Sequence, residues 1–282
     1  LPPASLLTTQ STHATVALMA ALMQREETGK GAFIDMALQE SGMAFQVEAI
    51  MDYRLNGRVA GPMTRTVADA AALMQVLSRP DARDSMSLPW QDIAWNAYDQ
   101  GVERLRGLKI GLLLDAGCGL PAEAEVLAAV QAAARRFEAA GAIVEPMRPF
   151  MTQTMLDGMD HFWRMRSRLD MNALMPADKA RVLPYIRAWA DSATGMDGEA
   201  VFHAASQFHA VRVASVKACA AFDYVISPTA PMPAFPAELP SPTNDPLHPL
   251  EHIGFTVPYN MSEQPAASIN CAKLTNRDAL VS

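Results

Sequence analysis

The chain has 282 residues, half of them hydrophobic, and 23 basic against 30 acidic residues give it a formal net charge of −7. This length allows one large domain or two small ones, each with a buried core. The acidic balance, without any run of basic residues, argues against nucleic-acid binding. No stretch of about 18 apolar residues occurs, and the opening LPPASLLTTQ lacks the features of a secretory signal, so we expect no membrane association.

The first 58 residues predict a helix, a strand and a second helix, over residues 12–28, 32–38 and 43–51. The sequence REETGKGAFIDMALQES within them resembles a segment of the family III CoA-transferases. That resemblance implies a catalytic aspartate upstream of this segment, so we interpret Asp35 as a structural residue of the strand. We assign residues 1–58 to a non-catalytic CoA-transferase-like segment.

The stretch GPMTRTVADAAALMQVL, residues 61–77, predicts an amphipathic helix. Thr66 is a good N-cap, Asp69 lies in the first turn, and Arg79-Pro80 ends the helix. Its apolar stripe consists of Val67, Ala70, Met74 and Leu77. The sequence of this stretch resembles the boundary between the two halves of amidase-signature enzymes. We therefore assign residues 61–282 to the C-terminal half of that fold and expect a chimeric, truncated chain.

The next elements predict an α/β unit. GLKIGLLLD, residues 107–115, has the continuous apolar character of a buried parallel strand. A helix between Pro121 and Gly141 and a strand over 142–147 complete one crossover unit. Residues 150–222 predict helices interrupted at Pro184, and DYVIS, residues 223–227, predicts a third strand. We expect a partial amidase-signature fold, with a mixed β-sheet flanked by helices.

Eight of the twenty prolines fall in SPTAPMPAFPAELPSPTNDPLHPL, which predicts an extended wrapping loop. After it, GFTVPYNMSEQPAASINC returns to two short apolar segments around a polar turn. By resemblance, three polar residues lie on the segments that approach the amidase cleft, and we take them as candidate substrate-binding residues: Thr229, Asn260 and Gln264. Each is equally well explained as a turn-forming residue.

The family resemblance implies a serine nucleophile, a second serine on a cis peptide bond, a lysine base and Gly-rich oxyanion amides. The chain has no Gly-Ser or Ser-Ser dipeptide, and its five lysines lack such a context. We assign no catalytic residue and expect the family reaction, carboxylic amide to acid and ammonia, to be absent from this chain alone. A small-molecule amide would be the substrate if a catalytic half completed the site.

Two other functions stay open. In the first, the chain is an accessory or binding subunit that docks onto a separate catalytic half. In the second, it carries a CoA-transferase-related function. Removal of a catalytic half would leave apolar surface and open strand edges, so we also expect partial folding or self-association.

The three cysteines, Cys118, Cys219 and Cys271, are widely spaced and odd in number. This pattern favours a reducing compartment, by default the cytoplasm, over a disulfide framework. Cys118 lies between a strand and a helix, where a thiol can become a nucleophile, but DAGCGLP is also an ordinary strand-to-helix loop. We interpret it as the latter.

No metal or cofactor is expected. His203 and His209 are six residues apart and fall on different helix faces, whereas His248 and His252 flank a proline in a loop. The alternating series Arg164, Arg166 and Arg168 is interpreted as a solvated surface rather than an anion site.

Overall fold

A computed structural model describes residues 61–81, 89–95, 101–273 and 280–281 of the chain. The elements predicted over residues 12–28, 32–38 and 43–51 lie outside the described residues, so the CoA-transferase-like segment stays a prediction. The chain separates into two compact units, Leu1–Gly101 and Val102–Ser282. Among the described residues, no helix is long and apolar enough to cross a membrane.

The described part of the first unit contains helix α4 (Val67–Leu77). The predicted cap is confirmed: the Asp69 backbone N–H donates to Thr66 Oγ1 over 3.1 Å, and the Thr66 hydroxyl donates to an Asp69 carboxylate oxygen over 2.7 Å. This reciprocal pair fixes the first turn. The apolar stripe is partly covered: Ala70, Met74 and Leu77 are half-buried, whereas Val67 at the start of the helix is 59% exposed.

The second unit is built on a three-stranded sheet with the order β2-β1-β3. Its strands are β1 (Lys109–Leu112), β2 (Ile143–Pro146) and β3 (Tyr224–Ile226), and both pairings are parallel. A short 3₁₀ helix, η2 (Val102–Leu105), precedes the sheet. Antiparallel pairing occurs in a separate ladder of β4 (Ala272–Lys273) and β5 (Leu280–Val281).

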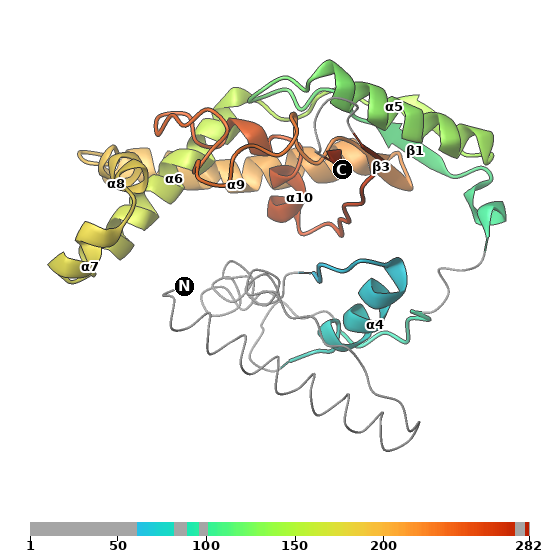
Figure 1. Cartoon of the computed structure of the whole chain (residues 1–282), viewed down its shortest axis with the longest axis horizontal. Coiled ribbons are helices and arrows are strands. Elements are labelled where there is room, and N and C mark those ends of the chain that lie inside the picture. The colour runs from blue at the N-terminus through green and yellow to red at the C-terminus, as the bar shows by residue number, and fades with distance from the viewer. Residues whose placement is uncertain (1–60, 82–88, 96–100, 274–279, 282) are drawn as a thin grey trace. The chain divides into compact units, whose positions relative to one another are not determined.

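Helix α5 (Ala124–Ala139) connects β1 to β2 and packs against β2, which confirms the predicted crossover unit (Figure 1). The helix begins three residues after Pro121 rather than at it, because Glu123 is the N-cap. Its end lies where predicted, and Gly141 adopts a φ of +95°, which suits glycine.

The region predicted to be helical contains α6 (Gln153–Asn172), α7 (Pro176–Arg181), α8 (Pro184–Asp191) and α9 (Gly198–Cys219). Thr152 and Asp197 cap α6 and α9 with their side chains. Pro184 starts α8, as expected for a residue that lacks a backbone N–H. Helices α6 and α9 lie side by side and pack together (Figure 1).

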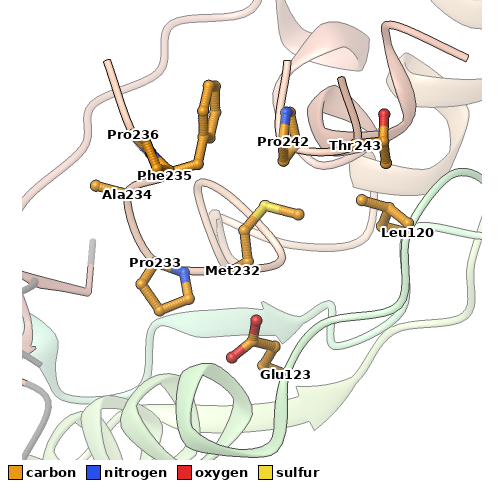
Figure 2. A pocket seen from close by; sticks show the side chains of 9 residues that line it. All are labelled: Leu120, Glu123, Met232, Pro233, Ala234, Phe235, Pro236, Pro242 and Thr243. Atoms are coloured by element: carbon orange, nitrogen blue, oxygen red, sulfur yellow. The ribbon is translucent and has the colours of Figure 1, made fainter. Parts of the chain in front are cut away.

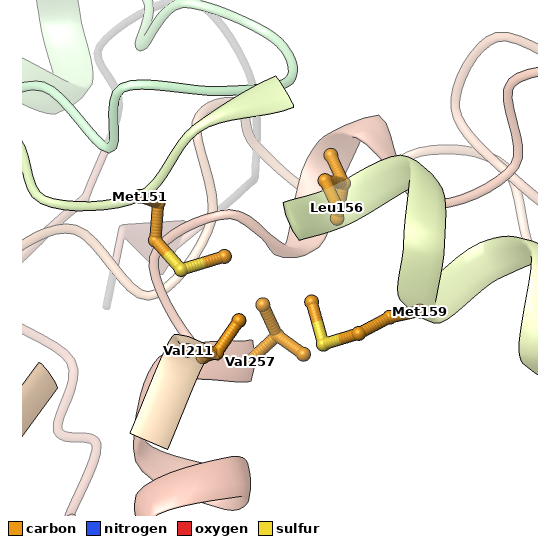
Figure 3. Packing of buried hydrophobic residues seen from close by; sticks show 5 residues of the cluster. All are labelled: Met151, Leu156, Met159, Val211 and Val257. Atoms are coloured by element: carbon orange, nitrogen blue, oxygen red, sulfur yellow. The ribbon is translucent and has the colours of Figure 1, made fainter. Parts of the chain in front are cut away.

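The short elements η3 (Glu251–Ile253) and α10 (Val257–Ser262) follow the proline-rich loop, and α10 packs on α9. The main core lies where α6, α9 and α10 meet, as Figure 3 shows, and its buried members are Met151, Leu156, Met159, Val211 and Val257. Met159 of α6 and Met151, just before this helix, help to fill the core, as flexible apolar side chains often do. Each such large side chain stabilises the fold by roughly 1.5–3 kcal/mol.

Candidate functional site

The loop that follows β1 carries residues from the strand to the start of α5. Asp115 accepts a hydrogen bond from the Gly117 N–H over 2.8 Å, which closes the first turn of the loop. The Gly119 N–H donates to Gln153 Oε1 over 3.0 Å, and the Leu120 N–H donates to the Glu251 carbonyl oxygen over 2.8 Å. Carboxyl ends of parallel strands are where α/β proteins place their ligand sites.

Two glycines allow this loop to lie against its neighbours. Gly117 and Gly119 have φ angles of +82° and +68°, in the left-handed region that favours glycine. A Cβ atom on Gly117 would overlap the Met151 carbonyl oxygen, and one on Gly119 would overlap that of Glu251. The Gly-Cys-Gly sequence is thus explained by backbone conformation and close approach.

Cys118, between these glycines, is half-buried. Burial, followed by the nearby charges of Asp115 and Asp157, raises the pKa of its thiol to about 11. A thiol that holds its proton so firmly is a poor nucleophile at neutral pH. The structure favours the interpretation of Cys118 as an ordinary loop cysteine.

We expect iodoacetamide to alkylate Cys118 at pH 7.5 roughly tenfold more slowly than a free thiol of pKa 9. The two-unit pKa difference lowers the thiolate population about 100-fold, and the greater nucleophilicity of a more basic thiolate recovers about a factor of ten. Peptide-resolved mass spectrometry, with a Cys118→Ser control, measures this rate. It should rise with pH up to about 11, and labelling faster than a model thiol would contradict the assignment.

Thr229 lies just after β3, and its Oγ1 is 2.8 Å from Ser268 Oγ. This contact joins the chain after β3 to the segment after α10. Asn260 is exposed on α10. Gln264 is instead held toward the interior, because its Oε1 accepts from Ser215 Oγ over 2.8 Å and from Ser262 Oγ over 2.9 Å.

The structure therefore bonds Thr229 to Ser268, bonds Gln264 to two serines elsewhere, and leaves Asn260 on the surface. Among the described residues, no hydrogen bond links one of the three to another. Their assignment as substrate-binding residues stays a proposal.

Sequence reasoning missed Tyr259, whose only signal was its place beside Asn260. Its hydroxyl is buried, and within the described part of the chain it has no hydrogen-bond partner. Burial and the neighbouring Cys219 raise the pKa of the Tyr259 hydroxyl to about 12. The nearby Ser227 hydroxyl offsets part of this shift, although the two hydroxyls do not meet the geometry of a hydrogen bond. The Tyr259 phenol is therefore neutral at physiological pH.

The interpretation of Arg164 as a solvated residue is wrong. Arg164 and Asp160 are each 6% exposed and form an ion pair one helical turn apart on α6. The guanidinium also donates to Ser192 Oγ over 2.8 Å and to the Leu247 carbonyl oxygen over 2.6 Å. Trp189 Nε1 donates to the second Asp160 oxygen over 2.8 Å.

The physical reason is that α8 and the proline-rich loop cover this face of α6 and satisfy both charges there. Arg168, one turn further on, is partly exposed, bonds to Thr194 and lies 3.7 Å from the Asp191 carboxylate. These arginines tie helices together and do not form an anion site.

The histidines have separate surroundings. His248 is exposed, and its Nδ1 lies 2.9 Å from the Asp245 carboxylate, which raises the pKa of the imidazole and lowers that of the carboxyl. His252 packs edge-on against Phe235 with ring centroids 5.9 Å apart, and burial lowers its pKa. His203 lies 3.6 Å from Glu199. Within the described ranges no group of three or more His, Cys, Asp or Glu side chains could hold a metal ion.

Comparisons with known proteins agree with this architecture. The family model described as Amidase matches residues 41–279. The chain is 32% identical over 240 residues to a glutamyl-tRNA(Gln) amidotransferase subunit of Synechococcus sp. (strain RCC307), and 31% identical to the corresponding protein of Myxococcus xanthus (strain DK1622). These matches cover 75% of this chain and 47% of each relative, so the chain spans about half the length of the curated relatives it matches.

Solved structures give the same result. A bacterial aryl acylamidase of the amidase signature family aligns with a TM-score of 0.66 and 27% identity, covering 78% of this chain and 47% of that one. A 6-aminohexanoate cyclic dimer hydrolase, 22% identical with a TM-score of 0.58, supports the fold. The family match begins at residue 41, inside the range that resembles CoA-transferases. Since it extends over most of the sequence, the chain belongs to the amidase family.

Proposed function

We propose that this chain is part of an amide hydrolase that converts a small carboxylic amide to an acid and ammonia. The observation that carries the proposal is the family match over residues 41–279. The similarity to an aryl acylamidase, which extends to its fold, adds support. The parallel sheet with its loops at the carboxyl end provides the kind of scaffold on which such sites are built.

We further propose that the reaction needs residues beyond this sequence. Amide hydrolysis by a serine requires a nucleophile, a base and an oxyanion hole, and loss of one member of such a set leaves only about 10³- to 10⁴-fold catalysis over water. Among the described residues, the buried serines bond to groups that are not bases: Ser215 and Ser262 to Gln264, and Ser241 to Tyr185.

Thr229, Asn260 and Gln264 are proposed to contribute one wall of the completed substrate cleft. Support comes from their positions: Thr229 lies three residues after the end of β3, and Asn260 and Gln264 belong to α10 and the segment after it. The buried Tyr259 hydroxyl lies on the same helix, α10.

The test is to assay the purified chain with 4-nitroacetanilide and with a primary aliphatic amide. We expect no turnover alone, and turnover after co-expression with the part of the Myxococcus xanthus protein that this chain does not match. Hydrolysis by the chain alone that disappears on substitution of one of its serines would contradict the incompleteness. Inactivity of a reconstituted, folded complex on both substrates would contradict the amidase proposal.

A second candidate, an accessory subunit that docks on a separate catalytic chain or on a second copy, is favoured by the sheet edges. Strands β2 and β3 are the outer strands of the sheet, and Ile143 and Tyr224 on them are 46% and 63% exposed. Exposed edge strands are natural pairing surfaces. A compact monomer with a cooperative melt, measured by size exclusion with light scattering and by calorimetry, would count against self-association.

The CoA-transferase-like character of residues 1–58, and with it a chimeric origin, also stays a proposal. It predicts saturable binding of coenzyme A to the full chain, measured by calorimetry, and no binding would contradict it.

A cytoplasmic location is proposed on the cysteine pattern alone, and cell fractionation tests it.

A further inference from the structure

A pocket of about 320 Å³ lies between the start of α5 and the proline-rich loop. Figure 2 shows Glu123 reaching from the start of α5 toward Met232, with Phe235 and Pro242 on the opposite side. Nine residues line the pocket: Leu120, Glu123, Met232, Pro233, Ala234, Phe235, Pro236, Pro242 and Thr243. The pocket is open to solvent, and its volume is large enough to admit a single aromatic ring.

The walls of the pocket are held in place by the fold. The Glu123 N–H donates to the Pro231 carbonyl oxygen over 2.7 Å, which fixes the loop to the start of α5. The Leu120 N–H is held by Glu251, and the Phe235 ring packs on His252. Prolines with a fixed φ angle make up much of the remaining wall. A preformed pocket of this kind binds a ligand without first having to be ordered.

The chemistry of the lining selects the charge of the ligand. Glu123 is the one charged residue among the nine described residues that line the pocket. The other side chains are mainly apolar, with the Phe235 ring and the Met232 sulfur available for contact with an aromatic group or a cation. Glu123 is an exposed carboxylate at the rim of a pocket with mostly apolar side chains, and such a carboxylate weakly favours a cation over an anion.

We propose that this pocket binds a small organic ammonium ion that carries an aryl group, with the ammonium against the Glu123 carboxylate and the ring against Phe235 and the prolines. The assignment rests on the pocket geometry and does not depend on amide hydrolysis. An arylalkylamine such as benzylamine fits the volume and the placement of charge.

The test uses benzylamine, its neutral analogue benzyl alcohol and the anion benzoate with the full 282-residue chain. Ligand-observed NMR titration gives each affinity. We expect benzylamine to bind with a Kd on the order of 1 mM, a value ordinary for a ligand of this size. Benzyl alcohol should bind several-fold more weakly, and benzoate should bind weakest.

Glu123→Gln should weaken benzylamine binding about 2- to 5-fold and leave benzyl alcohol unchanged, as expected for one exposed charge contact. The substitution is mild, because the Glu123 side chain makes no capping hydrogen bond. Glu125→Gln, at an exposed carboxylate in the first turn of the same helix, is the matched control and should change nothing. Phe235→Ala should weaken both ligands.

Three outcomes would overturn the proposal. They are the absence of saturable benzylamine binding by folded chain, equal binding of benzylamine and benzyl alcohol, and an equal effect of the Glu123 and Glu125 substitutions. A melting curve for each variant shows that loss of binding is not loss of fold.

Discussion

Replacement of Arg164 by alanine is expected to lower the free energy of unfolding by roughly 3–5 kcal/mol. The substitution leaves the Asp160 carboxylate, 6% exposed, without its cation. It also removes the donors that hold Ser192 and the Leu247 carbonyl oxygen. A buried charge without a partner costs more than the pair contributes, because its lost hydration is no longer offset.

Urea unfolding followed by tryptophan fluorescence measures this effect, and Trp189, bonded to Asp160, gives a local signal. Arg181→Ala is the control, because its ion pair with Asp178 is 3.7 Å long and exposed, and we expect a loss of at most about 1 kcal/mol.

A double variant separates the buried charge from the lost contacts. Asp160→Leu combined with Arg164→Met should recover much of the stability, since an apolar pair of similar volume carries no desolvation cost. A loss at Arg164 no larger than that at Arg181 would contradict the buried pair.

Elements whose signals are local in the sequence could be predicted. The Thr66 cap and its Asp69 partner lie three residues apart, so one short pattern determines both. The β1, α5 and β2 unit also follows from local periodicity and short connections. These predictions needed no knowledge of distant segments.

Burial could not be predicted where distant segments decide it. The alternation of arginine with methionine and serine on α6 is compatible with a solvated face. The face is buried because α8 and the chain at Leu247 pack against it. No residue close to Arg164 in the sequence predicts this packing. In α4 the predicted apolar stripe is covered only in part, since Ala70, Met74 and Leu77 are half-buried and Val67 remains 59% exposed.

The candidate site could be predicted only in part, for the same reason. The assignment of Thr229, Asn260 and Gln264 to a substrate cleft stays a proposal, and the sequence did not predict the bond from Ser215 on α9 to Gln264, because it depends on how α9 and α10 pack. Hydrogen bonds of this kind link residues far apart in the chain, whereas periodicity reports only local neighbours.

Replacement of Gly119 by alanine is expected to cost roughly 3 kcal/mol or more of folding stability. Its φ of +68° costs an L residue about 1–2 kcal/mol. The new Cβ would also overlap the Glu251 carbonyl oxygen. That oxygen accepts the Leu120 N–H, so relief of the overlap stretches a hydrogen bond that holds η3 to the loop after β1.

Two other glycines divide this cost into its parts. Gly195 has a φ of +89° with open space around it, so Gly195→Ala should cost only the conformational part, about 1–2 kcal/mol. Gly198, at the start of α9, has neither a positive φ nor a neighbour within 4 Å, and Gly198→Ala should be neutral or slightly stabilising. Equal losses at Gly119 and Gly195 in urea unfolding would show that the loop after β1 does not lie against η3 as described. A Gly119 loss well above that of Gly195 would establish the contact that positions one wall of the pocket, since Leu120 lines it.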